Sequence, residues 1–217
     1  MKSFKAIGAL IDYPSPDLVS ALDEIEACLK EEGTHTKNLA KLIAHLKAND
    51  LLGLQENYVA LFDRTPSLSL HLYEHLHGAS KDRGQAMVEL QTVYNLHGYN
   101  MSQPELPDFL PLFCEFLSIA PEKASRSMLG EAATILEAIR TGLEKRDNLY
   151  EAAISVLIEL GGAKINHQEL EKILKAQPED EESLEALDAA WEETPVTFGP
   201  DSARQDACEM SGAARGE

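Results

Sequence analysis

The sequence is poor in aromatic residues and cysteine. Only 6% of its 217 residues are aromatic, although 44% are hydrophobic, so the core must consist mainly of Leu, Ile, Val and Ala. Leu and Ala favour helices, and runs of β-branched residues are rare. The three cysteines, Cys28, Cys114 and Cys208, are widely spaced and form no CxxC pair. This pattern excludes a disulfide framework and a zinc ribbon.

Long apolar runs are also missing. No segment approaches the roughly 20 apolar residues that a helix needs to cross a bilayer. Residues Met1 to Leu10 lack the apolar stretch of a signal peptide. The sequence therefore predicts a cytoplasmic protein without stable membrane association.

Positive charge is scarce, because 19 Lys and Arg face 37 Asp and Glu for a formal net charge of −18. Such a chain has no basic surface to neutralise a nucleic-acid backbone, and an anionic membrane would repel it. The charge suits a basic or amphipathic peptide, because opposite potentials steer association. The alternative is that the charge serves solubility alone.

Helical spacing of apolar residues runs through most of the chain. Ser15 is placed to cap a helix that begins at Pro16 and ends before Gly33. Further stripes predict helices over 39–46, 54–62, 70–76, 87–94, 110–117, 129–143, 150–158 and 168–175. From Pro178 the chain turns acidic and then rich in Gly, Ala and Ser. The prediction is an all-α protein, with a helical-bundle domain over 1–175 and an acidic, flexible tail, expected to be disordered, over 176–217.

The one enzyme-like motif is HLYEH at residues 71–75, which matches the H-x-x-E-H pattern of some zinc peptidases. On a helix, His71 and His75 would share one face as zinc ligands, with Glu74 as general base. A zinc-dependent hydrolase is therefore an alternative. The competing interpretation is that these histidines border a polar pocket, because the sequence supplies no distinctive third ligand.

The segment after Asp108 is dense in Leu and Phe. Asp108 is placed to cap its helix, and Pro111 falls in the first turn, where no hydrogen-bond donor is missed. This is either a core helix or the floor of an apolar groove that receives a partner helix.

Two long segments closely resemble the NarJ family, the molybdenum-cofactor assembly chaperones of respiratory nitrate reductase. The first is LQENYVALFDRTPSLSLHLYEHLHG at residues 54–78, continued by KDRGQAM at 81–87, and the second is ELPDFLPLFCEFLS at 105–118. The opening LIDYP at 10–14 and the tail segment WEETPVTFG at 191–199 are also similar. The chain departs from the family at Phe109, where the family usually has His. In related redox-enzyme chaperones an Asp–His pair at this place is tied to peptide recognition.

The resemblance implies an all-α fold of the TorD/DmsD type and a chaperone rather than an enzyme. It implies binding to the N-terminal segment of the apo catalytic (alpha) subunit, which is held until the molybdenum cofactor and the iron–sulfur centres are inserted, before membrane attachment. The molybdenum-cofactor delivery machinery is a further candidate partner. The chain itself is expected to have no catalytic residues, no metal and no cofactor.

We therefore expect the client peptide to lie in a groove between the helix following Asp63 and the helix following Asp108. The candidate peptide-binding residues are Tyr58, Phe62, Asp63, Arg64, His71, His75, Asp108, Leu110, Phe113, Glu115 and Phe116. Leu110, Phe113 and Phe116 would supply apolar contacts, and the polar residues would border the groove. Besides the zinc-dependent hydrolase, a general helical adaptor is the other alternative to the chaperone.

Overall fold

The computed structural model describes residues 1–77, 81–101 and 105–176. The chain divides into two units, Met1–Pro178 and Glu179–Glu217. Apart from Ala176, the predicted tail lies outside the described residues.

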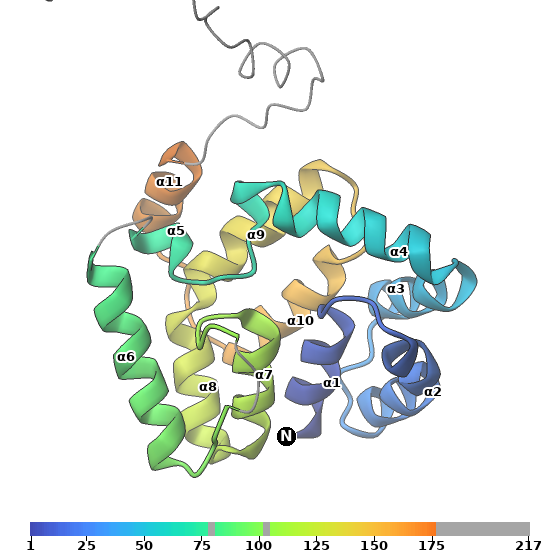
Figure 1. Ribbon diagram of the computed structural model, residues 1–217, viewed down its shortest axis with the longest axis horizontal. Coiled ribbons are helices and arrows are strands. Elements are labelled where there is room, and N and C mark those ends of the chain that lie inside the picture. Colours follow the sequence, from blue (N-terminus) through green and yellow to red (C-terminus); the bar gives the residue numbers. More distant parts are fainter. Residues whose placement is uncertain (78–80, 102–104, 177–217) are drawn as a thin grey trace, which may run out of the picture. The chain divides into compact units, whose positions relative to one another are not determined.

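The described part of the chain is helical, which confirms the predicted fold class (Figure 1). Its helices are α1 (Lys2–Leu10), α2 (Pro16–Glu31), α3 (Lys37–Ala48), α4 (Leu51–Tyr58), α5 (Glu74–His77), α6 (Lys81–Leu96), α7 (Leu110–Ile119), α8 (Glu122–Glu131), α9 (Ala133–Lys145), α10 (Glu151–Gly161) and α11 (His167–Ala176). A π-helix (Val59–Asp63) and a 3₁₀ helix (Pro66–Leu68) follow α4.

The start of the chain forms as its sequence predicts. The hydroxyl of Ser15 accepts a hydrogen bond from the Leu18 N–H at 3.1 Å, and Pro16 begins α2. Gly33 ends the helix in the left-handed region, at φ +73°, where a residue with a Cβ is strained. Short-range chemistry is sufficient to fix both ends of this helix.

Helix α1 lies between α2 and α7 and packs against both (Figure 1). Its residues Phe4, Ile7 and Leu10 are fully buried. The carboxylate of Glu32, just after α2, accepts hydrogen bonds from the first N–H groups of α1, from Lys2 at 2.9 Å and Ser3 at 2.7 Å. A side chain from the residue that follows α2 thus satisfies donors that have no partner inside α1.

The predicted single helix over 129–143 is two helices, α8 and α9, with the break at Ala132. Helix α10 packs against both, and α11 packs against α9. The apolar stripe continues across the break, so periodicity alone carries no sign of it. The close approach of α8 to α10 is a tertiary feature: a Cβ on Gly161 would lie 3.2 Å from the Gly130 nitrogen.

The predicted helix over 54–62 also changes form, because its last turn is a π-helix. The N–H of Arg64 donates to the carbonyl of Val59, five residues earlier, at 3.0 Å. This wider turn keeps Tyr58 and Phe62 in contact, with ring centroids 4.9 Å apart, while both side chains stay buried.

The predicted helix over 70–76 is wrong for most of its length, because α5 begins only at Glu74. The backbone before it pairs instead with the segment leading into α7. The N–H of Leu72 donates to the Asp108 carbonyl at 3.0 Å, and the N–H of Leu110 donates to the Leu70 carbonyl at 2.9 Å. His71 and Phe109 therefore form a single β-bridge between segments far apart in the sequence.

Candidate peptide-binding site

Asp108 is a fully buried carboxylate at the start of this region. The prediction that it caps α7 is wrong, because the helix begins after Phe109 without a side-chain cap. One carboxylate oxygen of Asp108 instead accepts the Tyr73 N–H at 3.1 Å, and the other lies 3.4 Å from Nδ1 of His71. The β-bridge turns Asp108 away from its own helix and towards the segment before α5.

Arg83 of α6 joins the same group of residues. Its guanidinium lies 3.7 Å from Asp108 and 2.9 Å from Glu74. Glu74 also bonds to the hydroxyl of Ser69. We call the fully buried Asp108 and its partly exposed partners His71, Glu74 and Arg83 the buried network; it ties α5 and α6 to the start of α7.

Burial raises the pKa of Asp108, but hydrogen bonds from His71 and the Tyr73 N–H, with the positive charge of Arg83, outweigh it and leave the pKa below its usual value. The hydrogen bond to Asp108 raises the pKa of His71. Burial lowers the pKa of His75, whose Nε2 lies 2.8 Å from the Ser69 carbonyl. The two histidines, four residues apart, therefore differ in their preference for a proton.

The geometry that the zinc hypothesis requires does not form. His71 lies on the β-bridge and His75 in the short α5, so they do not share one helical face. Their ring nitrogens face Asp108 and the Ser69 carbonyl. Within residues 1–77, 81–101 and 105–176, no three His, Cys, Asp or Glu side chains are grouped to hold a metal ion.

Four carboxylates from separate elements act electrostatically on one another or on the buried Tyr58, and we call them the acidic face. They are Asp12 after α1, Asp63 at the end of the π-helix, Glu105 before α7 and Glu115 within α7. Shielding from water raises the pKa of Asp12, and the negative charges of Glu105 and Glu115 add to the rise. Such mutual repulsion is relieved when a cation approaches. Because Glu105 also acts on His71, the acidic face adjoins the buried network.

Apolar side chains accompany these charges. Tyr13 is 45% exposed and Leu106 is 40% exposed. Tyr13 stands edge-on to the buried ring of Tyr58, with centroids 5.5 Å apart, and the Tyr58 hydroxyl donates to the Ile11 carbonyl at 3.2 Å. A rigid aromatic base therefore supports Tyr13. Asp12 and Tyr13 belong to the LIDYP segment, which resembles the NarJ family, but they are not among the residues predicted to bind the peptide.

The predicted site residues fall into three groups. His71, His75 and Asp108 come together around the β-bridge, and Asp63 and Glu115 contribute to the acidic face, with the exposed Arg64 following Asp63. Tyr58, Phe62, Leu110, Phe113 and Phe116 are no more than 5% exposed. The three apolar residues of α7 thus lie in the core, so the expected groove floor is not open in this structure. Phe116, for example, packs against Tyr94 with ring centroids 4.3 Å apart.

Comparison with known proteins decides the family. Residues 26–156 match the model of the nitrate reductase delta subunit family. The chain belongs to this family. It is 34% identical over 211 residues to the probable nitrate reductase molybdenum cofactor assembly chaperone NarW of Escherichia coli, covering 97% of this chain and 89% of the relative.

Two further relatives agree with this assignment. Over 203 residues the chain is 35% identical to the nitrate reductase molybdenum cofactor assembly chaperone NarJ of Escherichia coli, covering 90% of this chain and 84% of that protein. Over 160 residues it is 26% identical to the probable chaperone of the same name from Bacillus subtilis, covering 72% of this chain and 86% of that protein. Among the described helices, none has the length and apolar character that a membrane span requires.

Proposed function

We propose that this member of the nitrate reductase delta subunit family is a cytoplasmic assembly chaperone without catalytic activity. It binds the N-terminal segment of the apo catalytic subunit of nitrate reductase and assists insertion of the molybdenum cofactor and iron–sulfur centres before membrane attachment. The observation that carries this proposal is the similarity to named assembly chaperones over most of both chains.

The acidic face is the surface that best suits such a client. Its carboxylates attract a segment rich in Lys or Arg, and exposed Tyr13 and Leu106 offer apolar contact beside them. Aromatic side chains next to charge are common anchors in binding surfaces. This proposal moves the contact surface from the buried residues of α7 to the turn after α1 and the loop before α7.

The buried network has a supporting role in this proposal. Asp108 holds the loop before α7 through Tyr73 and His71, and that loop carries Glu105 and Leu106. Leu110, Phe113 and Phe116 act from the core by fixing the position of α7. A binding surface assembled from loops needs such support, because small displacements of its side chains cost affinity.

The expected affinity follows from the size of a helical contact. Burying about 600 Å² of apolar surface yields about 15 kcal/mol before costs, at about 25 cal/mol per Å². Ordering the peptide and restricting its motion offset most of this gain. Dissociation constants from about a micromolar to about a nanomolar are therefore reasonable.

Isothermal titration calorimetry with a synthetic N-terminal peptide of the client subunit tests the proposal. We expect one-to-one binding to the full chain, and no heat with a scrambled peptide of the same composition. Asp12→Asn and Glu105→Gln should each weaken binding about 3- to 10-fold, which corresponds to losing one favourable charge contact. Glu159→Gln, which removes an exposed carboxylate on α10, is the matched control.

Two outcomes would contradict the proposal in different ways. Absence of binding to the client peptide would remove the assembly function. Equal affinity for unrelated amphipathic helices would instead indicate a general helical adaptor. If the peptide binds but the Asp12 and Glu105 variants match the Glu159 control, the client site lies elsewhere on the chain.

A further inference from the structure

The turn between α1 and α2 presents Asp12 and Tyr13 next to each other at the surface. Both side chains are exposed, and Tyr13 is 45% exposed although its ring is large and apolar. The Tyr13 N–H donates to Oδ1 of Asp12 at 2.7 Å, which holds the carboxylate beside the backbone of Tyr13. Among the described residues, the other carboxylate oxygen of Asp12 has no hydrogen-bond partner. A free acceptor and an aromatic ring are therefore both open to a ligand.

Helix α4 holds both ends of this turn. Before the turn, the hydroxyl of Tyr58 donates to the Ile11 carbonyl at 3.2 Å, and after it Nε2 of Gln55 donates to the Pro14 carbonyl at 2.8 Å. Pro14 also restricts Tyr13 to extended backbone conformations. A side chain that is already held in position loses less freedom when a partner binds. The turn is therefore suited to a specific contact.

The ring of Tyr13 keeps one face available. In the part of the chain that the structure describes, the ring that contacts it is that of Tyr58, which is perpendicular to it at 89°. Perpendicular rings do not stack, so Tyr58 leaves at least one face of the Tyr13 ring uncovered. The face of an aromatic ring carries negative potential and attracts cations.

Asp12 has no cationic partner within the described residues. The charges that act on its pKa are those of Glu105 and Glu115, and both are negative. Glu115 is already paired with Lys5, at 3.1 Å. Asp12, rather than Glu115, is therefore the carboxylate that is free to pair with a cation from another molecule.

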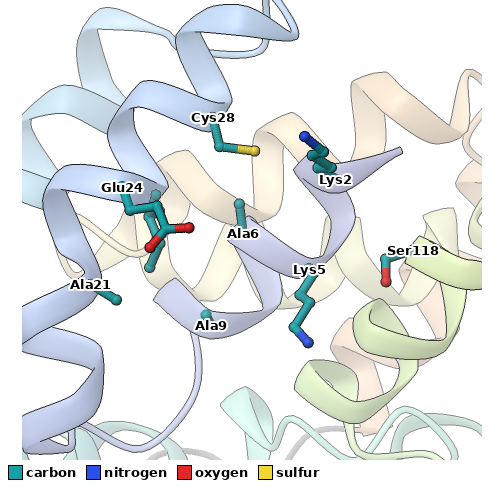
Figure 2. A pocket seen from close by; sticks show the side chains of 9 residues that line it. Lys2, Lys5, Ala6, Ala9, Ala21, Glu24, Cys28 and Ser118 are labelled. Carbon is teal, nitrogen blue, oxygen red and sulfur yellow. The ribbon is translucent and has the colours of Figure 1, made fainter.

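The open groove between α1 and α2, with a volume of about 380 Å³, has no such preference for charge (Figure 2). Figure 2 shows Lys2 and Lys5 of α1 and Glu24 of α2 around it. Lys5 is occupied by its pairing with Glu115, and Lys2 is offset by Glu24. Charges of both signs therefore surround this groove, whereas only negative charges act on Asp12.

We propose that Asp12 and Tyr13 form a site for an arginine side chain and select arginine over lysine in the segment that the chain binds. The guanidinium lies flat on the open face of the Tyr13 ring and donates a hydrogen bond to the free oxygen of Asp12. Arginine suits this site because its guanidinium is planar and stacks on aromatic rings, whereas the lysine ammonium is a strongly hydrated point charge. The inference rests on the proposed function only for the identity of the partner.

Two designed amphipathic helical peptides test this site. One has Leu on one face and Arg on the other, and the second has every Arg replaced by Lys. Isothermal titration calorimetry with the full chain at about 0.15 M salt measures both affinities. We expect the arginine peptide to bind about 3- to 10-fold more tightly, which is the size of effect that a cation on an exposed ring produces.

Substitutions at the two residues separate the ring from the charge. Tyr13→Phe keeps the ring and should keep the preference for arginine, whereas Tyr13→Leu removes the ring and should bring the two affinities within about twofold. Asp12→Asn should weaken binding of the arginine peptide more than that of the lysine peptide. Glu159→Gln, at an exposed carboxylate of α10, should change neither.

Gln55 is a positioning residue, because it acts on Tyr13 through the carbonyl of Pro14. Gln55→Leu should lower the ratio of the two affinities, since the turn is no longer held at that end. A general loss of structure would instead weaken both peptides equally, and circular dichroism reports whether each variant is folded. An unchanged ratio would show that Gln55 does not position the ring.

The inference is overturned if neither peptide binds, if both bind equally well or if the preference survives in Tyr13→Leu. Loss of the preference in Tyr13→Phe would also overturn it, because the hydroxyl rather than the ring would then be responsible. The designed peptides keep this test separate from the proposed function. If they show the preference but the client peptide does not bind, the assembly function alone is lost. If the client peptide binds and they show no preference, the arginine site alone is lost.

Discussion

Gly8 of α1 lies directly against Cys114 of α7. A Cβ at Gly8 would lie 2.7 Å from the Cβ of Cys114 and 3.0 Å from the Pro111 carbonyl oxygen. These are rigid atoms rather than the ends of flexible side chains, so the two helices can pack this closely only when residue 8 is glycine. The turn that carries Asp12 and the helix that carries Glu115 are held together through this contact.

Gly8→Ala is therefore expected to lower the free energy of unfolding by about 1–3 kcal/mol, because overpacking outweighs the higher helix propensity of alanine. The matched control is Gly84→Ala in α6, where a Cβ would meet no atom within 4 Å. That change should raise stability by up to about 1 kcal/mol. Urea unfolding followed by circular dichroism measures both, and equal effects would contradict the close contact.

Removing the carboxylate of Asp108 should destabilise the fold more than removing an exposed one. Asp108→Asn leaves Arg83 and His71 without their buried anion, and we expect a loss of about 3 kcal/mol or more. Asp63→Asn, at an exposed position of the acidic face, should change stability by no more than about 0.5 kcal/mol. Similar unfolding midpoints for the two variants would show that the buried network is not stabilising.

The two histidines of the HLYEH segment should titrate on opposite sides of the ordinary histidine pKa of 6.5. The pKa of His71 is raised by Asp108, and that of His75 is lowered by burial. NMR titration of the ring protons measures both values. Asp108→Asn should bring the pKa of His71 down, and a His71 that titrates identically with and without Asp108 would contradict the pairing.

The raised pKa of His71 also predicts how the stability of the fold depends on pH. Because the folded-state pKa of His71 lies above the unfolded value of 6.5, its pairing stabilises the fold fully below pH 6.5 and is lost as pH rises through the folded-state value. His71→Gln should therefore cost more stability at pH 6 than at pH 9. Chemical unfolding at the two pH values measures the difference, with His45→Gln, at a partly exposed position of α3, as control.

The contribution of Glu26 of α2 to stability should be lost as pH falls, whereas that of His71 is lost as pH rises. Hydrogen bonds from Lys30 and Lys47 lower its pKa from 4.5 to about 2, and Lys47 joins α3 to α2 through it. The stabilisation is present above pH 4.5 and disappears as pH falls towards 2. Glu26→Gln should cost about 1 kcal/mol or less at pH 7 and nothing near pH 2, whereas a constant cost would show that charge is not its cause.

The acidic face predicts salt-dependent association with the client peptide. Raising salt from about 0.05 to about 0.5 M shortens the screening length, so the association rate should fall severalfold while the dissociation rate changes little. Stopped-flow fluorescence measures both rates. An association rate that does not respond to salt would remove the electrostatic part of the proposal, and Asp12→Asn should reduce the salt response.

The sequence predicted features that depend on neighbours within a few residues. Ser15 and Pro16 indicated the start of α2, Gly33 its end, and the apolar stripes the all-α class. These succeed because caps, glycine turns and helical periodicity act through local hydrogen bonds and side-chain spacing. The long segments shared with the NarJ family were sufficient to indicate the family, because they extend over many consecutive residues.

Only the tertiary structure decided which residues the candidate site brings together. The HLYEH segment had the spacing of a zinc-binding helix, but backbone pairing with Asp108 and Leu110 holds its first residues out of the helix. Leu110, Phe113 and Phe116 of α7 face the core, and the carboxylates of the acidic face come from four separate elements. These contacts join residues up to about a hundred positions apart, and no local pattern records such contacts, because packing across the whole domain fixes them.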